Sequence, residues 1–239
     1  MTAMRIEPEI GGASVVLVGH LNPAIFTPHW LSSQDLITAQ EADAANILVI
    51  HPEATKFELA NMTVTVNTGQ FSLETTQAPW VPLVDLVGRI FVERLPHTPI
   101  FQFGINRNVH FSVEKEPVRN AIGRMLAPLE PWGTWGEQIG ARDVPNRGGL
   151  SHLTMRERWT EGEFKGSLNV TVEPSVRISG NTGMYVRVND HCEIIDHNDL
   201  DATAKILAFL TARFETSIRK SEGLVDQVMS LRDLVTAHA

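Results

Sequence analysis

Residues 189–199, which read NDHCEIIDHND, form the densest group of chemically reactive side chains in this chain of 239 residues. The stretch holds two histidines, the only cysteine of the chain and four acids, which are residue types that bind transition metals and transfer protons. However, residues 184–195 alternate apolar and polar side chains, which predicts a strand with His191 and Cys192 on opposite faces. These two side chains therefore cannot bind one ion together. We expect Cys192 to enter the core and residues 196–199 to start a helix, and we predict no metal site.

His191 gains importance if other polar side chains share its face of a sheet. Four segments alternate in the same way and predict an antiparallel sheet with one apolar and one polar face. They are residues 100–113, 151–159, 167–178 and 184–195. If these strands are neighbours, the polar face combines histidines and a carboxylate for proton transfer with arginines that bind carboxylate or phosphate groups. The candidate catalytic residues are His110, His152, His191 and Glu173, and the candidate ligand-binding residues are Arg156, Arg158 and Arg187. The alternative is an ordinary solvated face on which mixed charges pair across strands.

A second candidate site is the connection at residues 127–150, APLEPWGTWGEQIGARDVPNRGGL. Its length far exceeds the usual connection of about 4–6 residues, and connections this long in compact domains are often functional. Tryptophan and arginine also dominate the energetics of protein interfaces. The candidate partner-binding residues are Trp132, Trp135, Arg142 and Arg147. The alternative is that both tryptophans fold back on their own domain as a compact lid.

The composition argues against several classes of protein. The sequence lacks the phosphate-binding motifs GxxxxGK(S/T) and GxGxxG, the hydrolase motif GxSxG and the metal motifs HExxH and CxxC, so we predict no cofactor. A net charge of −8 disfavours nucleic-acid binding, because phosphate backbones bind clustered lysine and arginine. No apolar run has the length of a membrane span, no secretory leader is recognisable, and a single cysteine fits a reducing compartment. We therefore expect a cytoplasmic protein without membrane attachment.

The elements that must position these sites predict an α+β fold. We expect an extended, mainly antiparallel sheet with helices on one face and a long C-terminal helix. In the first part of the chain we expect strands at 13–19, 46–51, 57–66 and 69–75, and helices at 23–26, 28–44, 80–95 and 116–127. Beyond Asp199, apolar residues recur every three or four positions, which predicts the C-terminal helix. This helix either packs across its own sheet or, beyond Gly223, projects and pairs with a second subunit.

We expect a single domain over residues 1–239. If it divides, the lobes are an acidic N-terminal lobe at 1–98 and a lobe at 99–239 with the sheet and the C-terminal helix. Because catalytic motifs are absent, the preferred function is a non-catalytic assembly or interaction subunit. Residues 127–150 and the C-terminal helix would contact a protein partner or further copies of the chain. The alternative is an enzyme or small-ligand binder that acts on an anionic substrate through the polar sheet face.

Overall fold

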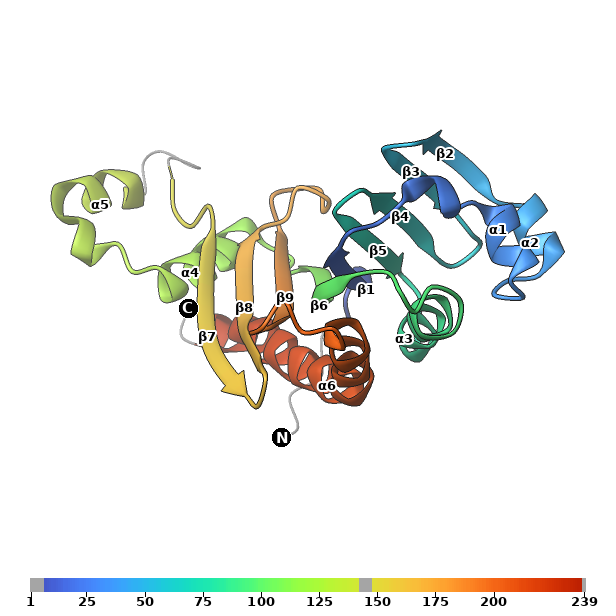
Figure 1. Cartoon of the computed structure of the whole chain (residues 1–239). Coiled ribbons are helices and arrows are strands. Elements are labelled where there is room, and N and C mark those ends of the chain that lie inside the picture. The colour runs from blue at the N-terminus through green and yellow to red at the C-terminus, as the bar shows by residue number, and fades with distance from the viewer. Residues whose placement is uncertain (1–6, 142–147, 238–239) are drawn as a thin grey trace.

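The computed structural model describes residues 7–141 and 148–237, and over these residues the chain forms one nine-stranded antiparallel sheet (Figure 1). The strand order is β2-β3-β4-β5-β1-β6-β9-β8-β7, so the central pair of β1 and β6 joins the first half of the chain to the second. The strands are β1 Ile10–Gly19, β2 Asn46–His51, β3 Ala54–Glu58, β4 Thr63–Asn67, β5 Gln70–Thr75, β6 Ile100–Ser112, β7 Leu153–Glu161, β8 Phe164–Pro174 and β9 Gly183–Ile194. The predicted α+β fold is confirmed.

The helices that pack on the sheet lie against its apolar face, as Figure 1 shows for α3 and α6. The α-helices are α1 Pro28–Ser33, α2 Ala39–Asp43, α3 Val81–Gly88, α4 Glu116–Leu126, α5 Gly133–Gly140 and α6 Ala202–Ala237. Short turns of other helix types are η1 Pro23–Ile25, η2 Arg89–Arg94 and η3 Glu130–Trp132. No helix in the described ranges is both long enough and apolar enough to cross a membrane.

Two elements of the first half differ from their predicted bounds. The helix predicted at 28–44 is two helices, because Asp35 adopts a left-handed backbone conformation (φ 56°) and α2 then starts with its own capping box. The strand predicted at 57–66 is likewise two strands. Between them the backbone N–H of Leu59 donates to the carbonyl of Met62 (2.7 Å) and closes a turn from β3 to β4.

The long helix α6 packs on its own sheet along its length. Its first half buries Leu210 and Phe214 in an apolar cluster to which the strands β1, β3, β4, β5, β6 and β9 and the helix α3 also contribute. Its second half buries Val225 and Met229 against a second cluster formed by β6, β8 and β9. The predicted alternative in which the helix projects beyond Gly223 is therefore wrong, because Val228, Leu231 and Val235 pack, partly buried, against this second cluster.

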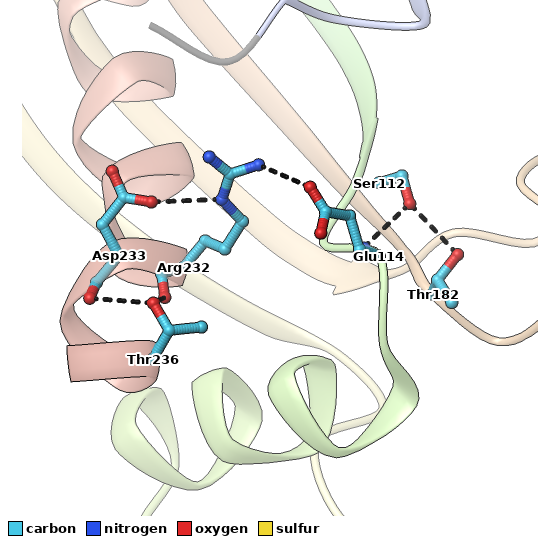
Figure 2. Close-up of polar contacts among 6 residues, drawn as sticks. All are labelled: Ser112, Glu114, Thr182, Arg232, Asp233 and Thr236. Atoms are coloured by element: carbon cyan, nitrogen blue, oxygen red, sulfur yellow. Dashed lines mark hydrogen bonds and ion pairs between the residues drawn. The ribbon is translucent and has the colours of Figure 1, made fainter. Parts of the chain in front are cut away.

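The end of α6 is also tied to the turn that follows β6 (Figure 2). The guanidinium of Arg232 lies 3.5 Å from the carboxylate of Glu114 and donates to Asp233. The backbone N–H of Glu114 donates to the hydroxyl of Ser112, which in turn donates to Thr182 at the start of β9. These contacts hold the last turns of α6 beside the β6–α4 connection.

Among the ion pairs that the described residues form between α6 and the sheet, two involve a buried side chain of a strand. Asp190 of β9, whose side chain is 2% exposed, accepts from the guanidinium of Arg213 (2.9 Å). Arg107 of β6 pairs with Glu222 of α6 (2.8 Å), and its guanidinium also donates to two backbone carbonyls. Both pairs join the helix to one of the central strands of the second half.

Candidate functional site

The face of the sheet opposite α6 carries the polar side chains that the alternating strands predict. We call the exposed surface of β6, β7, β8 and β9 on this side the polar face. Its clearest feature is one hydrogen-bonded row of side chains that crosses five strands in register. This asparagine row consists of Arg156, Asn169, Asn189, Asn106 and Ser14.

Every member of the asparagine row donates to the next in the same direction. Arg156 Nε donates to Asn169 (2.6 Å), and Asn169 Nδ2 donates to Asn189 (3.2 Å). Asn189 Nδ2 then donates to Asn106 (2.8 Å), and Asn106 Nδ2 donates to the hydroxyl of Ser14 (3.1 Å). An amide NH2 has two hydrogens and its oxygen has two lone pairs, so Asn106 and Asn189 each retain an N–H for a bound molecule. Asn169 Nδ2 also donates to Ser167 and retains acceptor capacity on its oxygen only. The row is a rigid polar strip with Arg156 at its cationic end.

Arg156 and Arg187 line a common hollow of about 460 Å³ above this strip. All its lining residues are polar, and we call it the arginine hollow. They are Asn106, Thr154, Arg156, Asn169, Thr171, Arg187 and Asn189. Arg158, the third predicted ligand-binding residue, lies outside it. It lines a neighbouring hollow together with His191 and Ser167.

The carboxylates of the polar face already have partners. Glu173 pairs with His152 (3.0 Å), and Glu193 pairs with Lys165 (3.1 Å). By contrast, within the part of the chain that the structure describes, Arg158 and Arg187 form no ion pair. The strands β7 and β9 therefore present arginines that form no ion pair with the described residues of this face.

The three candidate catalytic histidines do not meet at one point. His191 lies six residues further along β9 than Tyr185, the residue opposite His110, which corresponds to a separation of about 20 Å. Of the three, His152 alone has a carboxylate partner among the described residues, the side chain of Glu173. The catalytic arrangement that the alternative function needs is thus divided between two ends of the polar face.

His152 and Glu173 belong to a hydrogen-bonded chain that reaches the arginine hollow. His152 Nδ1 bonds the carboxylate of Glu173, and His152 Nε2 bonds the hydroxyl of Thr154 (both 3.0 Å). The hydroxyl of Thr154 is also 2.9 Å from that of Thr171. A carboxylate–imidazole–hydroxyl chain orients its hydroxyl. In this protein the oriented hydroxyls form the floor of the arginine hollow.

His110 is buried near the other end of β6. Its Nδ1 is 2.8 Å from the hydroxyl of Ser175, and its ring stacks on Tyr185 with ring centres 4.4 Å apart. Burial lowers the pKa of His110, the positive charge of Arg177 lowers it further, and Glu173 opposes these effects. His110 is thus favoured in its neutral form and packed as part of the interior.

The stretch 189–199 divides as its alternation predicts. Cys192 is fully buried, and burial raises the pKa of its thiol to about 12, so the reactive thiolate is suppressed. The acids after β9 form hydrogen-bonded turns before α6, which begins at Ala202. No group of three or more histidine, cysteine or acidic side chains in the described ranges could hold a metal ion.

Residues 127–150 are not a plain loop. They contain η3 and α5, which extend away from the sheet at one end of the molecule (Figure 1). Trp132 and Trp135 are 59% and 54% exposed, and their rings lie edge to face with centres 5.4 Å apart. The other two candidates of this segment, Arg142 and Arg147, lie outside the described residues.

Sequence reasoning missed two features of these surfaces. The first is the asparagine row, whose members occupy predicted polar positions but meet only because the strand registers align them. The second is the apolar edge strand β2, in which four successive residues, 47–50, are exposed. An uninterrupted apolar run usually indicates a strand covered on both faces, so the exposure of β2 could not be predicted from its sequence.

Comparisons with known proteins add no relative to this description. No model of a known protein family matches the chain, and a search of curated proteins returns no significant match.

Proposed function

We propose that this protein is a non-catalytic interaction subunit that binds a protein partner through η3 and α5. The observation that carries the proposal is the exposed pair of Trp132 and Trp135. Burial of a tryptophan removes a large apolar area from water, and tryptophans at interfaces are frequent hot spots. Two adjacent tryptophans exposed to solvent are therefore suited to insert into a partner.

The position of α5 supports this function. Among the described residues, neither apolar cluster of the protein includes a member of η3 or α5. Gly136 of α5 instead packs on the backbone of Leu129, within the same segment. The tryptophans thus contribute little to the stability of the rest of the fold. Because the apolar stripe of α6 packs against its own sheet, we expect η3 and α5, and not α6, to contact the partner.

The test combines two variants with a cross-linking measurement. A photoreactive amino acid at position 135 should form an adduct, inside cells, with a defined partner protein or with a second copy of this chain. Trp132→Ala should reduce that adduct strongly, because half of the apolar pair is lost. Met155→Ala is the matched control, since Met155 is equally exposed but lies on the edge strand β7.

Light scattering on the purified protein separates the two kinds of partner. A mass above the 26.5 kDa of one chain that returns to 26.5 kDa in the Trp132→Ala, Trp135→Ala double variant indicates self-association through α5. A stable monomer that also gives no protein adduct at position 135 contradicts the proposal.

A further inference from the structure

The unpaired arginines of the polar face are concentrated on β7 and β9. Arg156 and Arg187 approach the arginine hollow from these two strands, with β8 between them. The nearby carboxylate of Glu173 hydrogen-bonds His152 and forms no ion pair with either arginine. Arginine side chains that face a polar hollow without a counter-ion attract an anionic ligand.

The asparagine row limits the size of that ligand. Beyond Ser14 the same register continues into Glu74 of β5, then Thr63 of β4 and Glu58 of β3. Negative charges therefore lie at the end of this row that is opposite to Arg156. A long polyanion that lay along the sheet would be repelled there, whereas a small anion on β7, β8 and β9 would not.

The lining of the hollow indicates the chemistry of the ligand. Two guanidinium groups from different strands offer N–H donors from more than one direction. A tetrahedral phosphate dianion has three oxygens that can accept from both guanidinium groups at once, one more than the two oxygens of a planar carboxylate. The amides of Asn169 and Asn189 extend from this position and suit hydroxyl groups. A volume of about 460 Å³ is that of a small-molecule site.

We propose that the arginine hollow binds the phosphate monoester of a small hydroxylated molecule, such as a sugar phosphate. Arg156 and Arg187 hold the phosphate, and the asparagine row binds hydroxyl groups of the remaining ligand. This site is separate from the tryptophan pair of α5 and does not depend on the function proposed for that helix.

Isothermal titration calorimetry with ribose 5-phosphate tests the site. We expect saturable binding of one ligand per chain, and a loss of about tenfold or more in affinity for Arg187→Gln and for Arg156→Gln. Arg187→Lys keeps the charge without the fork and should lose less affinity than Arg187→Gln. The matched control is Arg219→Gln, because Arg219 is an exposed arginine of α6 on the other side of the sheet. Circular dichroism and thermal unfolding establish that each variant is folded.

Three further probes decide the class of ligand. Inorganic phosphate should compete with ribose 5-phosphate, and malate should compete more weakly. Absence of saturable binding, or equal affinity of the wild type and the folded Arg156→Gln, Arg187→Gln double variant, overturns the proposal. Tighter binding of malate overturns the assignment to phosphate. Tighter binding of a single-stranded oligonucleotide, with affinity that grows with its length, overturns the assignment to a small molecule.

Discussion

At the scale of single residues, the ion pair of Asp190 and Arg213 is the most consequential buried contact. The two partners are not equally enclosed, because the Asp190 side chain is 2% exposed and that of Arg213 is 23% exposed. The Arg213 guanidinium also stacks on the ring of Trp159 at 4.1 Å and lies 3.8 Å from Glu161. Substitution of Arg213 therefore leaves a buried carboxylate without its partner, whereas substitution of Asp190 leaves a guanidinium that is still partly exposed.

Arg213→Met should destabilise the protein more than Asp190→Asn. Methionine preserves packing on Trp159 but leaves the Asp190 carboxylate buried without its partner, a change that costs about 3–5 kcal/mol. After Asp190→Asn, Arg213 still reaches water and Glu161, so the loss should be smaller. Urea unfolding of both single variants measures the difference. The double variant Asp190→Asn, Arg213→Met should regain much of the stability that Arg213→Met loses. Greater destabilisation by Asp190→Asn than by Arg213→Met would contradict this account.

His110 makes stability depend on pH. Because burial lowers the pKa of His110 in the folded protein, the unfolded chain binds a proton more readily. The contribution of His110 to stability is therefore complete above the unfolded pKa of about 6.5 and is lost progressively as the pH falls below it. His110→Gln should reduce the fall in the urea midpoint between about pH 7.5 and pH 5.5, while the hydrogen bond to Ser175 can be kept. Parallel pH profiles for wild type and variant would show that other groups cause the fall.

For single residues, the sequence predicts which face of the sheet a side chain occupies but not which residues it contacts. Alternation placed Cys192 on the core side and His191 on the polar side, and the structure agrees. The partner of Asp190 could not be predicted, because Arg213 lies on another element. The separation of His110 from His191 likewise depends on the register of β6 against β9, which periodicity does not contain.

At the scale of elements, α6 has a polar middle. Ser217 and Ser221 are buried between the two apolar clusters, and among the described side chains each hydroxyl has no hydrogen-bond partner. Burial of a hydroxyl without a partner costs free energy, so the hydroxyl groups of these two serines do not stabilise the fold. Their small size allows the helix to lie close to the sheet at this point.

Ser221→Ala should stabilise the protein by about 1 kcal/mol, because it removes an unpaired hydroxyl and raises helix propensity. Ser221→Leu should instead destabilise it by about 1–3 kcal/mol, since the added volume has no room under the helix. Thermal and urea unfolding of the two variants provide the comparison. Destabilisation by alanine would mean that the hydroxyl has a partner, such as an ordered water.

Element boundaries were less predictable than element types. The strong patterns of β6, β9 and α6 gave the right elements within a few residues, because each pattern reflects one buried face. The break at Asp35 was missed because neither glycine nor proline marks it in the sequence. The helical content of residues 127–141 was also missed, because Gly133, Gly136 and Gly140 in α5 favour a loop over a helix.

At the scale of the whole molecule, one sheet has different surroundings on its two sides. Helices and two apolar clusters cover one side, and the other carries the asparagine row and the arginine hollow. The tryptophan pair extends from one end, and the apolar edge strand β2 lies at the other (Figure 1). The proposed protein contact and the proposed ligand site are thus physically separate, so each can be removed by mutation without loss of the other.

The course of α6 across both apolar clusters has a kinetic consequence for the whole molecule. Both clusters include side chains of α6, so the helix cannot leave the sheet without exposing part of each cluster. Backbone amides of β1 and of β9, although they belong to different halves of the sheet, should therefore exchange their hydrogens with solvent at a common, slow rate set by global unfolding. The edge strands β2 and β7 should exchange faster by local opening. The protein would then unfold as one cooperative unit, with local opening confined to its two edge strands.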